Sequence, residues 1–145
     1  MALVIDANSA DALSRGECPS SRRILAWVRQ GGRVCSGGLL QKELGRTSLS
    51  GLLQSWSAAG RLILISDELI DPEVANITPL ARSDDPHVLA VVKIGDVPVI
   101  VTGDGNLIRD LKDPSITGQK RKIISQSGGA FSKEKIVMAL LRKAC

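Results

Sequence analysis

Two aspartates follow apolar runs that are typical of buried strands. The run at residues 3–5 stops at Asp6. The run at residues 97–101 leads through Thr102 to Asp104. In an open parallel sheet, ligands bind beyond the carboxyl ends of the strands, near the point where the strand order reverses. We therefore expect both carboxylates to face one crevice, although either aspartate alone is also explained as the start of a turn or a helix cap.

Two further acids belong to segments that we predict to be helical. Glu43 lies within an apolar stripe at helical spacing, formed by Leu39, Leu40, Leu44 and Thr47. A carboxylate on a core-facing stripe is costly to bury unless it is paired or bound to metal, and a salt bridge to an arginine is the competing explanation. Asp85 precedes Pro86 at the N-cap of its helix, and this capping position is by itself an adequate structural explanation.

The four acids suggest a metal centre for phosphate chemistry. They come from separate segments, and we expect no histidine or cysteine to join them, because His87, the single histidine, follows Pro86 and fits a surface or capping position. Ligands made only of oxygen suit Mg²⁺ or Mn²⁺ rather than zinc. Such ions typically act on phosphate substrates, and paired ions stabilise the attacking and leaving oxygens together. The predicted ligands are Asp6, Glu43, Asp85 and Asp104.

Apolar periodicity predicts strands that alternate with helices. The expected strands are residues 3–5, 33–36, 61–66, 97–101 and 122–125. The expected helices are residues 18–30, 39–46, 50–59, 83–95 and 132–143. Residues 67–79 give mixed signals and receive no assignment, whereas residues 112–122 mix Pro, Gly and charge and are predicted to be a loop. The alternation favours one three-layer α/β domain, residues 1–145, with a mainly parallel central sheet flanked by helices.

Composition narrows the class of protein further. The formal charge is +4, from 19 Lys and Arg against 15 Asp and Glu. Neutralising four acids in a metal pocket would leave 11 acids against 19 bases, or +8, which attracts a polyanion. A mildly basic protein with solvated charges explains the same numbers. An odd number of widely spaced cysteines, no basic leader before Asp6 and no apolar run of membrane-spanning length together lead us to expect a cytoplasmic protein without a membrane segment.

The first two acids belong to motifs that are similar to those of a known family. Leu-Val-Ile-Asp-Ala-Asn at residues 3–8 looks like an opening strand with its first metal-binding aspartate and the following Asn8. Glu43 matches the acid expected in the helix after the second strand. Together with the two motifs below, they resemble the PIN-domain nucleases, a family that includes the ribonuclease toxins of bacterial and archaeal toxin–antitoxin pairs.

The resemblance continues into the second half of the chain. Ser-Asp-Asp-Pro-His-Val-Leu-Ala at residues 83–90 is similar to the family's third acidic motif, and its spacing selects Asp85 over its neighbour. Val-Thr-Gly-Asp-Gly-Asn-Leu at residues 101–107 is similar to the fourth, with Asp104 as ligand and Thr102 as a supporting hydroxyl. Each motif alone is weak, but the order and spacing of all four are fairly specific.

The resemblance implies a metal-dependent endoribonuclease that hydrolyses RNA phosphodiester bonds. Its carboxylates would hold Mg²⁺ or Mn²⁺ or position metal-bound water, with Asn8, Thr102 and Asn106 in supporting or substrate-binding roles. Asn106 stands where the family often has an acid, and Asp110, six residues after Asp104, is the candidate to supply a metal ligand in its place. An antitoxin protein and a second copy of the chain are the protein partners that the family suggests.

Two other functions fit part of the sequence. A haloacid-dehalogenase-like phosphatase would use Asp6 as nucleophile and the acids near Gly103, but it needs a second carboxylate at position 8, where Asn8 stands. That function also leaves Glu43 and the motif at residues 83–90 without a role. A non-catalytic nucleic-acid-binding module would instead rely on the basic surface, including the run at residues 120–122, and would need no metal.

Overall fold

A computed structural model describes residues 2–125 and 134–143 and shows an α/β fold around a five-stranded sheet. The strands of this sheet are β1 (Ala2–Ile5), β2 (Arg33–Gly37), β3 (Leu62–Ile65), β4 (Val99–Val101) and β5 (Lys122–Ile124). Every neighbouring pair of strands is parallel. The predicted parallel α/β sheet is therefore confirmed.

The sheet has the order β3-β2-β1-β4-β5, so the chain builds outward from β1 in one direction and then returns to its other side. The order of strands thus reverses between β1 and β4. Ile5 pairs with Val101 in the ladder, and the backbone N–H of Asp6 donates to the Val101 carbonyl at 2.9 Å. The residues that follow these two strands consequently emerge side by side at the position where ligands bind in such sheets.

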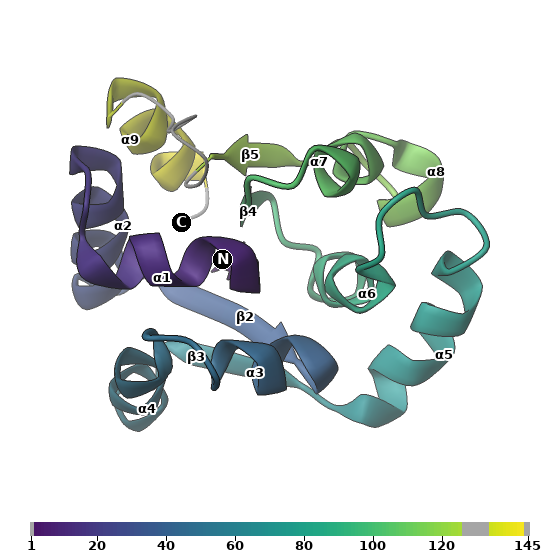
Figure 1. Ribbon diagram of the computed structural model, residues 1–145, viewed down its shortest axis with the longest axis horizontal. Coiled ribbons are helices and arrows are strands. Elements are labelled where there is room, and N and C mark those ends of the chain that lie inside the picture. Colours follow the sequence, from purple (N-terminus) through teal and green to yellow (C-terminus); the bar gives the residue numbers. More distant parts are fainter. Residues whose placement is uncertain (1, 126–133, 144–145) are drawn as a thin grey trace.

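Helices cover both faces of the sheet, which gives three layers. Within the described part of the chain they are α1 (Ala7–Arg15), α2 (Pro19–Arg29), α3 (Gly38–Leu44), α4 (Ser50–Ala58), α5 (Asp67–Ile77), α6 (Pro86–Gly95), α7 (Gly105–Leu111), α8 (Pro114–Thr117) and α9 (Glu134–Lys143). Figure 1 shows α1, α2 and α9 on one side and α5, α6 and α8 on the other. The short helix α3 contacts both α1 and α6, so it connects the two helical layers at the edge of the sheet.

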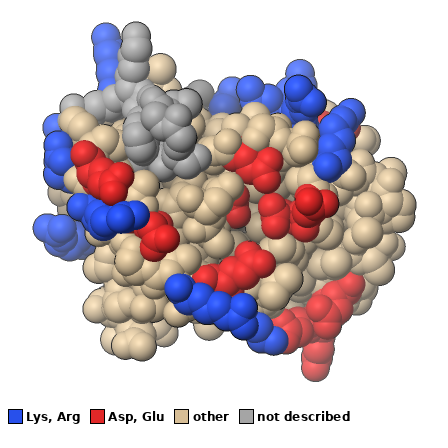
Figure 2. Space-filling model, viewed as in Figure 1, with Lys and Arg blue, Asp and Glu red and all other residues tan. Residues whose placement is uncertain are grey.

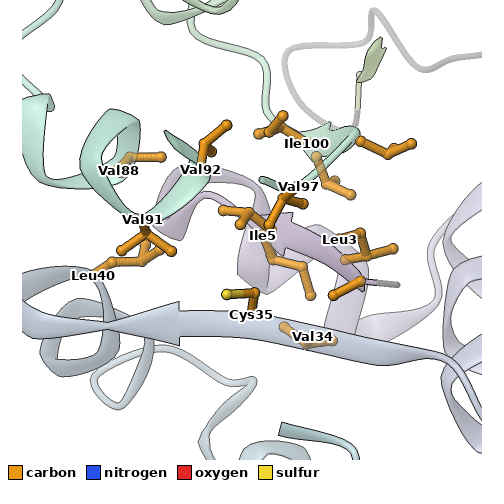
Figure 3. Close-up of a cluster of buried hydrophobic side chains, with 14 of the residues drawn as sticks. Leu3, Ile5, Val34, Cys35, Leu40, Val88, Val91, Val92, Val97 and Ile100 are labelled. Atoms are coloured by element: carbon orange, nitrogen blue, oxygen red, sulfur yellow. The ribbon is translucent and has the colours of Figure 1, made fainter. Parts of the chain in front are cut away.

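An aliphatic core holds the helices that carry the acidic residues. Leu40 of α3 and Val91 of α6 are fully buried and point toward each other, and Ile5 of β1 lies close by (Figure 3). Each such side chain contributes roughly 1.5–3 kcal/mol through its burial. Packing of α3 and α6 on the same strands fixes where Glu43 and Asp85 lie relative to Asp6.

The turn from β2 into α3 depends on two glycines. Gly38 has a φ of 51°, a conformation that favours glycine. A Cβ at Gly37 would stand 2.6 Å from the backbone carbonyl oxygen of Ile65 and 2.7 Å from a methyl carbon of Ile70. No side chain fits at Gly37, so this close approach to Ile65 and Ile70 requires glycine. Helix α3 begins at Gly38, directly after β2, and Glu43 therefore lies at the same edge of the sheet as Asp6.

One prediction of secondary structure was wrong, one segment without an assignment is helical, and one predicted helix start cannot be compared. Residues 67–79 contain α5, whose buried Ile70 and Ile77 have helical spacing but whose interior holds Pro72, a residue that normally breaks helices. The loop expected at residues 112–122 includes the short helix α8. The expected start of the last helix, at residues 132–133, lies outside the described residues. None of the helices described by the structure is both long and apolar enough to cross a membrane.

Candidate active site

Asp6 lies at the centre of the carboxyl edge, with only 3% of its surface exposed. It occupies the N-cap position of α1, but its side chain makes no capping hydrogen bond. Instead, the Thr102 hydroxyl donates to Asp6 Oδ2 at 2.8 Å, and the backbone N–H of Asp104 donates to the same hydroxyl at 3.2 Å. The carboxylate is therefore oriented by the segment after β4, and helix capping does not explain its presence.

The environment of Asp6 favours its protonated form. Burial raises its pKa to about 6, the Thr102 hydrogen bond opposes this rise, and the negative charges of Asp85 and Asp104 add to it. These electrostatic interactions mean that carboxylates from three separate segments lie near one another. A cation placed among them would relieve both the repulsion and the lost hydration.

Asp85 connects the remaining acids. It is the N-cap residue of α6, but its side chain makes no capping hydrogen bond, so the simple structural explanation fails here too. Burial raises the pKa of Asp85, His87 lowers it, and the charges of Asp104 and Glu43 raise it. Asp85 thus interacts with Asp6, Glu43 and Asp104, and the structure brings all four predicted acids together.

Asp104 does act as a helix cap. Its Oδ1 accepts hydrogen bonds from the backbone N–H groups of Asn106 at 2.9 Å and Leu107 at 3.3 Å, at the start of α7. Both bonds use one carboxylate oxygen. The capping explanation therefore holds for Asp104, and it fixes this carboxylate in place while the charge still acts on Asp6 and Asp85.

The prediction of a surface position for His87 was wrong. His87 is only 8% exposed, and its Nε2 lies 3.4 Å from Glu43 Oε2 and 3.8 Å from Asp85 Oδ1. These three side chains can present ligand atoms within 4.8 Å of one another. The expectation that no histidine joins the acids was therefore also wrong. The single feature of the sequence that indicated this contact is that His87 follows Asp85 by two residues.

The environment of Glu43 differs from the prediction, which placed this residue within a core-facing apolar stripe. Leu40 and Leu44 are fully buried, but Leu39 is 49% exposed, so the core-facing stripe is narrower than predicted. Glu43 lies at the border of this stripe with its side chain 33% exposed. Within the described residues the side chain that contacts its carboxylate is His87, with Nε2 3.4 Å from Oε2, rather than the arginine of the competing explanation.

The other expected site residues fall into two groups. Thr102 supports Asp6 directly, and Asn8 and Asn106 are exposed in the first turns of α1 and α7. Asp110 is fully buried, and its carboxylate accepts hydrogen bonds from the backbone of Arg82 and Ser83. These bonds occupy the group that was expected to bind metal, so we leave Asp110 out of the proposed ligand set.

Acidic side chains gather in the middle of the face shown in Figure 2, and others lie at its left and lower right. Lys and Arg side chains lie at its left, along its top and below the central acids. Acidic side chains in the middle suit a cation, and the nearby Lys and Arg side chains can attract the backbone of a polyanion.

The structure brings the four acids of the predicted motifs to one edge of the sheet. Asp6, Glu43, Asp85 and Asp104 lie on four elements that meet at one sheet edge. Membership of the PIN-domain nucleases stays a prediction from the motifs. Comparison with protein-family models and with curated proteins found no match to this chain.

Proposed function

We propose that this protein is a metal-dependent endoribonuclease that hydrolyses RNA phosphodiester bonds. The observation that carries the proposal is the convergence of Asp6, Asp85 and Asp104 on the sheet edge where β1 and β4 end, with Glu43 and His87 beside Asp85. Like charges in a partly desolvated pocket destabilise a fold, so such groupings are typical of functional sites that bind cations. The choice of RNA as substrate rests on the resemblance to PIN-domain nucleases.

The side chains present fit Mg²⁺ or Mn²⁺. Asp6, Glu43, Asp85 and Asp104 would hold the cation through carboxylate oxygens, the donors that these ions prefer. His87 adds a nitrogen donor beside Glu43 and Asp85, and imidazole is accepted more readily by Mn²⁺ than by Mg²⁺. When bound, the cation supplies charge stabilisation at the phosphate and makes a water molecule more acidic.

Other residues of the chain orient the site and attract the substrate. The Thr102 hydroxyl holds Asp6 in one orientation, and the N-cap bonds hold Asp104. The exposed amides of Asn8 and Asn106 can donate hydrogen bonds to phosphate oxygens. Lys and Arg side chains on the face shown in Figure 2 raise the local concentration of a polyanion.

The convergence of the acids favours this proposal over the two alternatives. A phosphatase built on Asp6 would leave Glu43 and Asp85 without a role, yet both interact with the other acids. Asn8, at the position where that chemistry needs an acid, is exposed and cannot replace it. A module that only binds nucleic acid would not need buried, mutually repelling carboxylates. An antitoxin partner and a homodimer are expectations from the resemblance alone.

Cleavage of RNA should depend entirely on a divalent cation. We expect the purified protein to cut a labelled single-stranded RNA with Mg²⁺ or Mn²⁺ and to leave it intact in chelator, measured by gel electrophoresis. Asp104→Asn, purified in parallel, is the control for contaminating nuclease. Asparagine is also a good N-cap, so this variant loses the charge and keeps the helix start.

Three results would contradict the proposed function. Cleavage that survives chelation, or that is equal in Asp104→Asn, would exclude the metal mechanism. Rapid hydrolysis of a small phosphate monoester without RNA cleavage would favour the phosphatase. RNA binding without cleavage, and without Mg²⁺ or Mn²⁺ binding, would favour the non-catalytic module.

Substitution of His87 should change the choice of metal. In His87→Gln an amide replaces the imidazole nitrogen, so we expect Mn²⁺ affinity to fall about tenfold while Mg²⁺ affinity changes little. Calorimetric titration with each ion measures both affinities. An equal loss for the two ions would show that His87 contributes packing and not a ligand atom.

A further inference from the structure

Asp110, in the last turn of α7, is a buried acid that the proposed mechanism does not use. Its side chain is completely shielded from solvent. The Arg82 backbone N–H lies 3.0 Å from both Oδ1 and Oδ2, and the Ser83 N–H donates to Oδ2 at 2.9 Å. Two consecutive backbone N–H groups that point at one anion form a compact anion-binding arrangement.

The backbone segment that Asp110 holds lies immediately before Asp85 in the chain. Arg82 and Ser83 belong to the connection between α5 and α6, and Asp85 follows Ser83 by two residues. The Asp85 side chain makes no capping bond to its own helix. The bonds to Asp110 therefore fix the backbone that directly precedes Asp85 and the start of α6.

The same helix also carries Asp104 at its other end. Asp104 caps α7 at the N-terminus, and Asp110 lies six residues later in the same helix. Helix α7 thus carries the candidate ligand Asp104 at its N-terminus. Through Asp110, the same helix also holds the backbone that precedes the candidate ligand Asp85. Asp85 and Asp104, whose charges act on each other, are thus both connected to α7.

We propose that Asp110 is a positioning residue that holds the Arg82–Ser83 backbone and thereby places Asp85 opposite Asp104. This inference rests on the proposed function, because it assigns Asp110 a role toward the same metal site. The hydrogen bonds from the backbone N–H groups of Arg82 and Ser83 to Asp110 hold this segment in place. The Arg82 guanidinium is 3.6 Å from both Asp110 and Asp113 and is half exposed, so its ion pairs contribute little.

The decisive experiment measures Mn²⁺ affinity of the full chain by calorimetric titration and the Mn²⁺ dependence of RNA cleavage. In Asp110→Asn, the new amide nitrogen must face a backbone N–H donor, so the segment moves. Loss of a residue that orients metal ligands typically lowers affinity by about 10–100-fold, and we expect a decrease of that size. Cleavage at saturating Mn²⁺ should recover toward the parent rate, because the ligands themselves remain.

Two matched variants separate positioning from charge. Asp113→Asn removes the other carboxylate near Arg82, and Arg82→Gln removes the guanidinium but keeps the backbone N–H. Both should bind Mn²⁺ like the parent. Circular dichroism and a melting curve establish that each variant is folded at the assay temperature. If Asp110→Asn is unfolded there, Asp110→Glu replaces it, since it keeps the charge and shifts the oxygens by one methylene.

The outcomes are distinct. Folded Asp110→Asn or Asp110→Glu with the Mn²⁺ affinity of the parent would overturn the positioning role, while metal-dependent cleavage by the parent would leave the proposed function standing. A lowered melting temperature with unchanged affinity would mean that Asp110 only stabilises the fold. Absence of Mn²⁺ binding by the parent itself would overturn both proposals together.

Discussion

Asp85→Asn is expected to lower the rate of RNA cleavage by at least about 100-fold, the effect typical of removing one preorganised electrostatic group from an active site. Asp85 interacts with Asp104, Glu43 and His87, and it also raises the pKa of Asp6. Its replacement by a neutral group of the same shape therefore weakens the whole cluster. The single-turnover rate on a labelled RNA at fixed Mn²⁺ measures the loss.

The neighbouring acid supplies a matched control. Asp84 is exposed and is the weakest of the named charges that act on Asp85. Asp84→Asn changes the net charge by the same amount, so we expect its cleavage rate to stay within a few-fold of the parent. Equal losses of cleavage rate in the two variants would show that the rate depends on the net charge of the protein and not on the position of Asp85. A large loss only in Asp84→Asn would show that the wrong aspartate was chosen.

Metal-free Asp6→Asn is expected to be more stable than the parent above pH 6, by about 1–3 kcal/mol. The pKa of Asp6 is about 6 in the fold against 3.8 as the ordinary value. A raised carboxyl pKa means that its contribution to stability is fully present below pH 3.8 and is lost as the pH rises through about 6. Asparagine never ionises, and its oxygen can still accept the Thr102 hydrogen bond, so the variant avoids this loss.

Melting curves in chelator at several pH values measure the difference. A gain of 1–3 kcal/mol corresponds to roughly 3–10 °C for a chain of this size. The gain should vanish well below pH 3.8, where Asp6 is largely protonated in both the folded and the unfolded state. Asp11→Asn is the control of opposite sign, because hydrogen bonds from Ser48 lower the pKa of this exposed acid. We expect Asp11→Asn to melt at or below the parent temperature at pH 8.

Added Mg²⁺ or Mn²⁺ should stabilise the parent more than it stabilises Asp6→Asn. A ligand that binds only the folded state stabilises it in proportion to its affinity, and the parent has the intact site. The parent should therefore gain more than Asp6→Asn. A metal-free Asp6→Asn that melts below the parent, or equal metal shifts in both proteins, would argue against a crowded acidic metal site.

Local sequence patterns were sufficient to predict the layers of the fold and the positions of Asp6 and Asp104. Short apolar runs bounded by polar residues mark buried strands, and the residue after such a run must lie at the carboxyl edge of a parallel sheet. Because this relation involves only neighbours in sequence, it could be derived without coordinates. The order of the strands, with its reversal between β1 and β4, required the structure.

Only the tertiary structure decided how the distant elements complete the site. His87 and Glu43 are 44 residues apart, and Asp110 and Ser83 are 27 apart. Helical spacing shows which residues share a face but not which other element that face meets. Leu39 was consequently placed in the core although it is exposed. The sequence by itself determined which acids stand at the ends of strands and helices, while the packing of α3, α6 and α7 determined that His87 joins them and that Asp110 supports them from behind.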